Sequence, residues 1–227
     1  KRARREGIKM ERIICLAIGY LFGMFQTSYI IGKIHHMDIR QYGSGNAGTT
    51  NALRTLGKKA GAMTLIGDML KCVIAILIVD AVFKNRYQEI LPLLGMYTAA
   101  GCVLGHNFPF YLKFKGGKGI AASSGVVISL MLFPKYCFMF TVFGIIFFAL
   151  VAKISRYVSL ASLIGMAMFF VEFLIWGFLG WLPLSGTSLV EGTVIVFALA
   201  ALAFIRHRSN IVRLVHGTER KIGEKKN

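Results

Sequence analysis

The chain alternates long apolar stretches with short polar clusters. Seven stretches are apolar enough, at roughly 20 residues each, to cross a bilayer as helices. They cover residues 12–33, 61–83, 88–105, 119–134, 136–152, 159–181 and 190–206. Barrel strands would alternate polar and apolar residues, which these stretches do not do. The pattern therefore predicts an all-α polytopic membrane protein with about seven transmembrane helices.

Two details bear on the number of spans. Only Pro134 and Lys135 separate the fourth stretch from the fifth. The N-terminal sequence KRARREGIK is strongly basic, and an odd number of spans places it on the side opposite to most other cations. Since Met10 opens a sensible start, MERIICLAIGYLFG, we expect residues 1–9 to be a non-native or extended N-terminus. The alternative is six or eight spans.

Positive charge is concentrated after the first, third, fifth and seventh stretches, which seven spans place on one side of the membrane. The cations of these segments are Lys33, Arg40, Arg54, Lys58, Lys59, Lys113, Lys115, Lys118, Lys153, Arg156, Arg206, Arg208, Arg213, Arg220, Lys221, Lys225 and Lys226. The connections on the other side offer Lys84, Arg86 and Lys135. The positive-inside rule therefore places the cation-rich side in the cytoplasm. We expect residues 10–216 to form one membrane domain and residues 217–227 a basic cytoplasmic tail.

The composition supports a membrane protein. Of the 227 residues, 56% are hydrophobic, which is too apolar for a soluble domain of this length, and the formal net charge is +17. Because the cations lie beside apolar stretches, anionic lipid headgroups and anionic substrates explain the charge better than nucleic acid. The four cysteines, Cys15, Cys72, Cys102 and Cys137, lie in apolar stretches without CxxC spacing. This disfavours a disulfide framework or a metal site.

Four polar clusters interrupt the apolar sequence, and the predicted topology places all of them on the cytoplasmic side. They are residues 43–51 (GSGNAGTTN), 105–119 (GHNFPFYLKFKGGKG), 153–162 (KISRYVSLAS) and 206–213 (RHRSNIVR). Glycine, small hydroxyl residues and cations dominate each cluster. This composition predicts a membrane-embedded site that holds anions.

The first cluster matches the dinucleotide pattern G-x-G-x-x-G, with Asp68 twenty residues after Gly48. A dinucleotide site is disfavoured because a membrane helix, and not a strand, precedes the glycines. Asp68 itself lies in an apolar helix, where it can pair with Lys71. The glycines still allow the backbone to approach a ligand and its amides to form an anion-binding nest. The candidate residues are Gly43, Ser44, Gly45, Asn46, Gly48 and Asn51, with Arg54 as a planar cation suited to phosphate.

The second cluster contains FKGGKGI, which is similar to a P-loop but incomplete. Leu112 stands where the first glycine belongs, and Gly119 replaces the hydroxyl residue that would hold magnesium. A lysine among glycines directly before a helix is nevertheless a good phosphate site. The alternative is a basic loop that touches lipid phosphates, and the three glycines favour a close-fitting site. The candidates are His106, Gly116, Gly117, Lys118 and Gly119.

The last two clusters are less specific. Hydroxyls at a helix start commonly cap or pack, and we interpret Ser155, Ser159 and Ser162 first in this way. The second set, His207, Asn210 and Arg213, recurs every three residues and shares roughly one helix face. A contribution to the site is one reading of this set, and cations that only anchor the topology are the other. The clusters contain no Ser-His-Asp order, HExxH motif or carboxylate pair, which disfavours a hydrolytic general-base design.

Together the motifs GSGN-x-G-x-TN, GH-x-FP…KFKGGKG, RYVSLAS and RHR-x-NI-x-RL resemble the bacterial acyl-phosphate:glycerol-3-phosphate acyltransferases, membrane enzymes of phospholipid biosynthesis. The similarity keeps the same order from about Met10 to Glu219. The first two motifs are highly specific in combination. The departures are Ala47 for a usual proline, Thr49 for a frequent alanine, and Ala122, followed by Ser123, for a usual threonine. None of them touches the cations, so they bear on residue assignments and not on the function.

The resemblance implies seven helices, with active-site loops facing the cytoplasm from the bacterial inner membrane. It implies transfer of a fatty acyl group from acyl phosphate to the sn-1 hydroxyl of glycerol 3-phosphate, without cofactor or metal. The products are lysophosphatidic acid (1-acylglycerol 3-phosphate) and phosphate. Membrane lipid is the expected surrounding, no nucleic acid is expected, and protein partners are not indicated.

The candidate residues can be sorted by role on this basis. The catalytic set is Lys118, Ser44, Arg54, His207 and Asn210. The substrate-binding set is Gly43, Gly45, Asn46, Gly48, Asn51, His106, Gly116, Gly117, Gly119, Ser159 and Arg213. The alternative function is a transporter or flippase for a phosphorylated anion. Inverted repeats would support it, and none is recognisable in the sequence.

Overall fold

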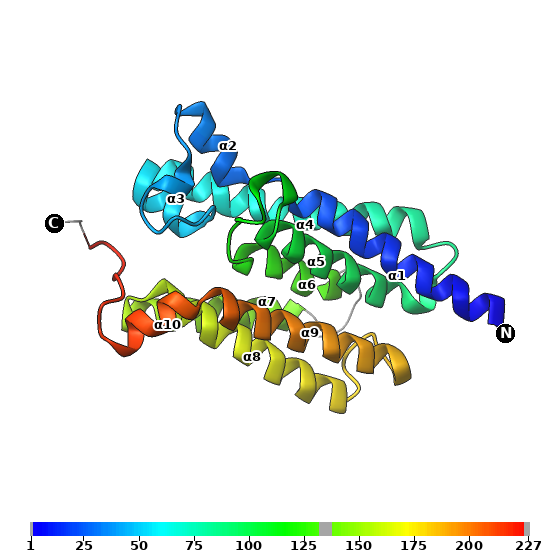
Figure 1. Ribbon diagram of the computed structural model, residues 1–227. Helices are drawn as coiled ribbons and strands as arrows, with labels where there is room; N and C mark the ends of the chain where they lie inside the picture. Colours follow the sequence, from blue (N-terminus) through cyan, green and yellow to red (C-terminus); the bar gives the residue numbers. More distant parts are fainter. Residues whose placement is uncertain (1, 132–137, 225–227) are drawn as a thin grey trace. The chain divides into compact units, whose positions relative to one another are not determined.

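The computed structural model describes residues 2–131 and 138–224, and within these ranges every regular element is helical (Figure 1). The chain divides into two compact units, residues 1–133 and residues 134–227. Each unit has its own packed core, and each is described by itself below. The all-helical class predicted from the apolar stretches is confirmed.

The first unit is organised around one buried helix. Its elements are α1 (Arg2–Gly23), α2 (Thr27–Ile34), η1 (Ile39–Gln41), α3 (Thr49–Leu56), α4 (Lys58–Phe83), η2 (Gln88–Ile90), α5 (Leu91–Asn107), η3 (Phe110–Leu112) and α6 (Ile120–Met131). Nearly every residue of α5 is buried, and this helix packs against α1, α4 and α6. A helix that is apolar on all faces has to lie inside the fold, and α5 does.

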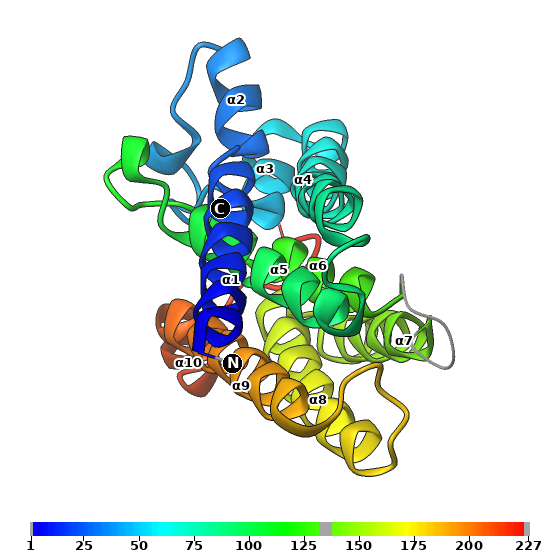
Figure 2. The ribbon, with the colours of Figure 1, turned by 90° about the vertical axis from the view of Figure 1, so that its right-hand side faces the viewer.

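Glycines allow the backbones of α1 and α5 to come into contact. The four positions are Gly19 and Gly23 on α1, and Gly101 and Gly105 on α5. A Cβ at any of them would overlap a backbone carbonyl oxygen of the other helix. Such pairs of small residues four positions apart are typical of close helix packing in membranes. Figure 2 looks roughly along these helices and shows α1 lying beside α5.

The first apolar stretch, residues 12–33, is two helices and not one continuous helix. Gln26 has an extended backbone between α1 and α2, with φ −101° and ψ 94°. Its buried side-chain amide donates to the carbonyls of Gly23 (3.4 Å) and His106 (2.9 Å). The Lys71 ammonium donates to the carbonyls of Gly23 and Phe25. Buried side chains thus satisfy carbonyls that the interruption leaves without helical partners.

The second unit is built from α7 (Phe138–Ser155), α8 (Val158–Phe178), α9 (Gly186–Arg206) and α10 (Arg208–Val215). Its core contains an aromatic cluster on α7 and α8. Phe140 lies 4.1 Å from Trp176 and 5.5 Å from Phe169 between ring centroids. The chain after α10 returns to the α7–α8 turn, where Arg156 and Ile222 exchange two hydrogen bonds of 2.8 and 3.0 Å. Residues 218–222 are therefore docked on this unit.

Among the described residues, five helical segments are long and apolar enough to cross a membrane. They are Met10–Ile34, Lys58–Phe83, Phe138–Ser155, Val158–Phe178 and Gly186–Arg206, and each corresponds to a predicted stretch. The other two predicted stretches correspond to α5, with 17 residues, and α6, with 12. The predicted separation at Pro134 and Lys135 lies outside the described residues. The number of seven spans therefore stays a prediction.

Candidate active site

The buried side-chain amide of Asn51 holds the glycine loop at residues 43–48 in place through three hydrogen bonds. Its Nδ2 donates to the carbonyls of Ile39 (2.9 Å) and Tyr42 (3.1 Å), and its Oδ1 accepts from the Ser44 backbone N–H (2.8 Å). Asn51 is only 1% exposed. The loop is thus held to the start of α3 by side-chain contacts, and Ser44 is exposed on its outer side.

Two glycines of this loop have a backbone that other residues rarely adopt. Gly43 has φ +61° and Gly45 has φ +73°. A Cβ at Gly43 would also overlap the side-chain oxygen Oδ1 of Asn51. The glycines predicted to let the backbone approach a ligand are therefore required first to form the turn itself. Asn51, predicted as a substrate contact, has a defined role as the residue that holds this turn.

The second glycine loop, residues 116–119, folds back onto the end of α5. The backbone N–H of Gly117 donates to the His106 carbonyl (3.1 Å), and that of Gly116 donates to the Asn107 carbonyl (3.2 Å). Gly119, with φ +82°, turns the chain directly into α6. Lys118 is half-buried one residue earlier. A lysine therefore stands at the N-terminus of a 12-residue helix, as the sequence predicted.

The two glycine loops meet at Gly117. A Cβ at this position would overlap Nε2 of His106 and would lie 2.6 Å from the carbonyl oxygen of Ala47. A second contact joins the neighbouring segments, because Arg40 Nη1 donates to the Leu112 carbonyl over 3.1 Å. Two clusters separated by more than sixty residues in the sequence are thus in contact in the first unit.

Asn107 is a residue of this region to which the sequence interpretation gave no site role. It is fully buried, and neither its Oδ1 nor its Nδ2 has a hydrogen-bond partner within the described part of the chain. A Cβ at Gly119 would lie 2.6 Å from Oδ1. The amide therefore lies directly behind the turn that leads into α6. The only signal in the sequence was its place next to His106 in the GHNFP motif.

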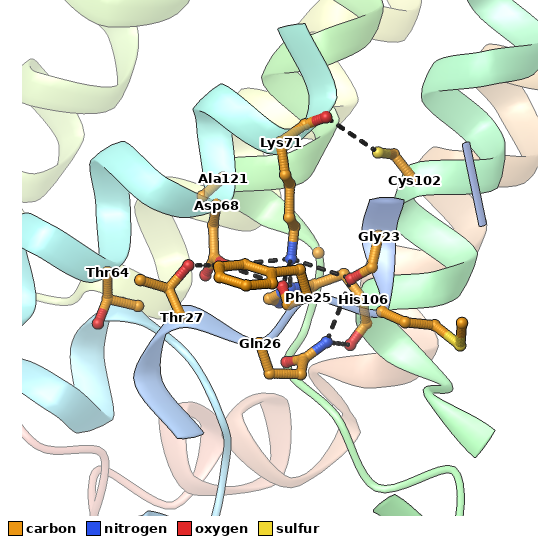
Figure 3. A network of polar contacts seen from close by, with 12 residues as sticks. Gly23, Phe25, Gln26, Thr27, Thr64, Asp68, Lys71, Cys102, His106 and Ala121 are labelled. Atoms are coloured by element: carbon orange, nitrogen blue, oxygen red, sulfur yellow. Dashed lines mark hydrogen bonds and ion pairs between the residues drawn. The ribbon is translucent and has the colours of Figure 1, made fainter. Parts of the chain in front are cut away.

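A buried polar network surrounds His106, the residue whose ring lies against Gly117 (Figure 3). The predicted pair is confirmed, since Lys71 Nζ lies 3.1 Å from Asp68 Oδ1 and both side chains are at most 4% exposed. The pair is not self-contained, however. Nζ also lies 2.8 Å from Nδ1 of His106, and Thr27 donates to the same Asp68 oxygen over 3.1 Å. The network therefore joins α2, α4 and α5.

The second unit brings three predicted residues together around a carboxylate. Glu219 accepts from Ser159 Oγ (2.9 Å) and Asn210 Nδ2 (2.7 Å) through Oε1, and from Arg213 Nε (2.6 Å) through Oε2. The Glu219 side chain is 4% exposed. Ser159, interpreted first as a cap or packing residue, is thus part of this polar cluster. Glu219 is not among the residues that the sequence predicted for the site.

Three further polar residues of this unit donate to carbonyls four residues earlier in the chain. His207 Nδ1 donates to the Ala203 carbonyl (2.7 Å), since a carbonyl can only accept. Ser155 and Ser162 donate to carbonyls four residues earlier in their own helices. Both hydroxyls are therefore bound to the backbone of their own helix, in agreement with the interpretation that gave these serines no site role.

Two carboxylates outside the spans, Asp38 and Glu219, are held in the ionised form. Hydrogen bonds from the Arg40 guanidinium lower the pKa of Asp38. Burial by itself would raise the pKa of Glu219, but hydrogen bonds from Arg213, Asn210 and Ser159 outweigh it and lower that pKa. A carboxylate with a low pKa and occupied lone pairs is a weak proton acceptor. These contacts make both carboxylates poor candidates for a general base.

Neutralising Glu219 tests its role in the second unit. We expect Glu219→Gln to lower the melting temperature in detergent by about 5 °C at neutral pH, because a buried charged acceptor is lost. The lowered folded-state pKa stabilises the protein above the ordinary glutamate value of 4.5, and this stability is lost as the pH falls through the folded value. The melting temperature of the wild type should therefore fall more steeply below about pH 4.5 than that of the variant.

The matched control is Glu224→Gln, because Glu224 is an exposed carboxylate of the same tail. We expect this change to leave both the melting temperature and its pH dependence close to wild type. Equal melting curves for wild type and Glu219→Gln between pH 4 and 7 would show that the cluster around Glu219 does not stabilise the unit.

The structure thus divides the candidate residues into two groups. The residues around the glycine loops, together with His106 and the exposed Arg54, belong to the first unit. The residues Ser159, His207, Asn210 and Arg213 belong to the second. Within the described part of the chain, no three His, Cys, Asp or Glu side chains come together in a way that could hold a metal ion. The donors of both groups are amides, hydroxyls and cations, which are suited to anions.

Comparison with known proteins decides the family. A family model described as glycerol-3-phosphate acyltransferase matches residues 13–217. The chain belongs to this family. The resemblance inferred from the four motifs is thereby confirmed.

Individual relatives match over almost their whole length. A glycerol-3-phosphate acyltransferase of Clostridioides difficile (strain 630) is 44% identical over 218 residues, covering 94% of this chain and 97% of the relative. One of Thermoanaerobacter sp. (strain X514) is 40% identical over 217 residues, covering 95% and 98%.

The fold is also similar to a solved structure. The crystal structure of PlsY (YgiH), an integral membrane glycerol 3-phosphate acyltransferase, in its glycerol 3-phosphate form, gives a TM-score of 0.76 at 32% identity. The match covers 93% of this chain and 96% of that one. The lysophosphatidic acid form of PlsY gives 0.74.

Proposed function

We propose that this protein transfers a fatty acyl group from acyl phosphate to the sn-1 hydroxyl of glycerol 3-phosphate. The products are lysophosphatidic acid and inorganic phosphate, and the reaction is the first acylation of phospholipid biosynthesis. The observation that carries the proposal is the family match over residues 13–217, which includes every predicted site residue. The relatives are named glycerol-3-phosphate acyltransferases, and PlsY has forms with glycerol 3-phosphate and with lysophosphatidic acid.

The glycine loops are assigned to acyl phosphate. Two loops of the first unit meet at Gly117, and together they bring the N-terminus of α6 and the half-buried Lys118 to one place. Such an arrangement favours a phosphate and neutralises the charge that develops as it leaves. Arg54, His207 and Asn210 are assigned to glycerol 3-phosphate, because a guanidinium fork, an imidazole and an amide suit its phosphate and hydroxyl groups.

The chemistry needs little from the protein beyond alignment and charge neutralisation. The sn-1 hydroxyl oxygen attacks the acyl carbonyl carbon, and the bond from that carbon to the bridging phosphate oxygen breaks. Phosphate leaves with the electron pair, and the hydroxyl proton passes to a phosphate oxygen of the substrate. This route fits the contacts of Asp38 and Glu219, which are both engaged as hydrogen-bond acceptors. Acyl phosphate is a mixed anhydride, so the leaving group is already good and positioning supplies most of the rate.

We further propose that the protein lies in the bacterial cytoplasmic (inner) membrane with seven spans and with its glycine loops in the cytoplasm. The distribution of lysine and arginine supports this orientation. Acyl phosphate then reaches the loops from the cytoplasmic leaflet, and the acyl chain stays beside apolar helices. Surrounding lipid is the expected partner.

The decisive experiment incubates purified protein with acyl phosphate and labelled glycerol 3-phosphate. We expect labelled lysophosphatidic acid and one phosphate released for each acyl group transferred. Parallel reactions replace the donor with acyl-CoA or acyl-carrier protein, and we expect no product from either. Product from acyl-CoA alone would contradict the proposed donor. Uptake of glycerol 3-phosphate into vesicles without covalent change would instead support the transporter.

A further inference from the structure

We propose that Lys71 is a positioning residue for acyl transfer, which acts by fixing the His106 ring on which the loop 116–119 rests. The proposal rests on the proposed function for its activity measurements, but its structural part can be tested without them. Lys71 lies in the middle of α4 and is 4% exposed. The sequence interpretation treated it only as the counter-ion of Asp68. Its contacts extend much further than that (Figure 3).

Four groups surround the Lys71 ammonium nitrogen. They are the Phe25 carbonyl (2.7 Å), His106 Nδ1 (2.8 Å), the Gly23 carbonyl (3.0 Å) and Asp68 Oδ1 (3.1 Å). The two carbonyls and Asp68 Oδ1 accept hydrogen bonds, and the ammonium can only donate, so its three N–H groups are shared among these partners. His106 Nδ1 therefore accepts as well. This places the ring proton on Nε2, so the network selects one tautomer of His106.

The Nε2 edge of His106 is the edge that faces the loop 116–119. A Cβ at Gly117 would overlap this atom, which means that the ring lies directly against the loop backbone. The Gly117 N–H also donates to the His106 carbonyl over 3.1 Å. The orientation of this one residue therefore sets where Gly117 lies, and Lys118 follows it immediately in the chain.

Residues between α1 and α2, and at the start of α2, also bind this network. Gln26 donates to the His106 carbonyl (2.9 Å), the same oxygen that accepts from Gly117. Thr27 donates to Asp68 (3.1 Å), so the start of α2 is bound to the ion pair. The interruption between α1 and α2 thus supports His106 in two ways: its carbonyls bind Lys71, and the Gln26 side chain binds the His106 carbonyl. Hydrogen bonds of this kind hold functional residues in place although the donors themselves do not touch substrate.

Two roles of Lys71 can be distinguished by removing both charges together. If Lys71 serves only to neutralise Asp68, then Lys71→Met/Asp68→Asn should restore the stability and the activity that Lys71→Met loses. If Lys71 positions His106, the double variant restores thermal stability but not turnover. We expect the double variant to melt within a few degrees of wild type. We expect its kcat with acyl phosphate to be about 10- to 100-fold lower, the usual effect of a small misplacement.

The Michaelis constants give a second readout. We expect KM for glycerol 3-phosphate to stay within about twofold of wild type, because the loop 116–119 is assigned to the other substrate. The matched control is Lys84→Met, at the exposed C-terminal end of the same helix, which should leave all constants unchanged. Wild-type kcat in a folded Lys71→Met/Asp68→Asn variant would overturn the proposal, while an inactive wild-type protein would contradict the proposed function instead.

A spectroscopic measurement decides the structural part whether or not the protein is active. Nitrogen-15 spectra of histidine-labelled protein report the tautomer of each ring, and the signal of His106 is identified by its loss in His106→Gln. We expect the Nε2–H tautomer in wild type and a mixture of tautomers in Lys71→Met/Asp68→Asn. A proton on Nδ1 of His106 in wild type would overturn the proposal.

Discussion

Replacing Lys118 with methionine should abolish turnover in a protein that remains folded. Lys118 is the cation at the N-terminus of α6, set among three glycines that leave room for a bound phosphate. Methionine keeps the length of the side chain but removes the charge that stabilises the leaving phosphate. Loss of one such group in a low-dielectric site typically costs about 100- to 1000-fold in kcat. The measurement is phosphate release and lysophosphatidic acid formation, with the melting temperature recorded for the same sample.

The control for this prediction is Lys113→Met, which removes a positive charge from an exposed position five residues earlier. We expect at most a small effect, because exposed charges are well screened. Lys118→Arg should recover only part of the activity, since a planar fork does not reproduce the point charge of an ammonium. Full turnover in folded Lys118→Met would exclude Lys118 from the chemistry.

Gly117→Ala is expected to reduce kcat/KM for acyl phosphate by at least about 100-fold. A single methyl group at this position would overlap Nε2 of His106 and would lie 2.6 Å from the backbone oxygen of Ala47. The His106 ring is held by Lys71 and the Ala47 carbonyl belongs to the backbone, so neither can move cheaply. The methyl group therefore has to push the two loops apart. Steady-state kinetics with each substrate varied in turn would detect the loss.

Gly165→Ala provides the matched control for Gly117→Ala. Gly165 lies within α8, and a Cβ there would meet nothing within 4 Å. We expect this variant to keep its activity and to gain stability of up to about 1 kcal/mol, because alanine is the better helix former. If Gly117→Ala were as active as Gly165→Ala, the two glycine loops would not act as one unit during turnover.

Much of the fold was predictable because its determinants are local. An apolar stretch of membrane length has to form a helix, since the bilayer offers no partner for unpaired backbone groups. This reasoning located α4 and α7 to α9, and it placed the glycine loops at helix ends. The candidate site was predictable for a similar reason: in the sequence itself, glycines and cations stand at the start of a helix, where the unpaired amides attract anions.

The sequence did not reveal the interruption of the first span. Residues 24–26 carry no proline, and nothing in the local pattern requires α1 to end at Gly23. The helix ends there because Gln26 and Lys71 offer buried hydrogen bonds to the carbonyls that become free. The donor on α4 is 48 residues away from Gly23. Such a compensation exists only once the helices have packed.

The roles of Glu219 and Lys71 at the candidate site also could not be predicted from the sequence. The sequence by itself determined the helical membrane class, the four polar clusters and the family to which they belong. Only the tertiary structure showed that Ser159, Asn210 and Arg213 converge on Glu219, and that Lys71 reaches His106 across 35 positions. Helix propensity and hydrophobic pattern depend on neighbouring residues, whereas a buried charge is stable only with partners that distant segments supply. The partners of these charges were therefore decided by packing.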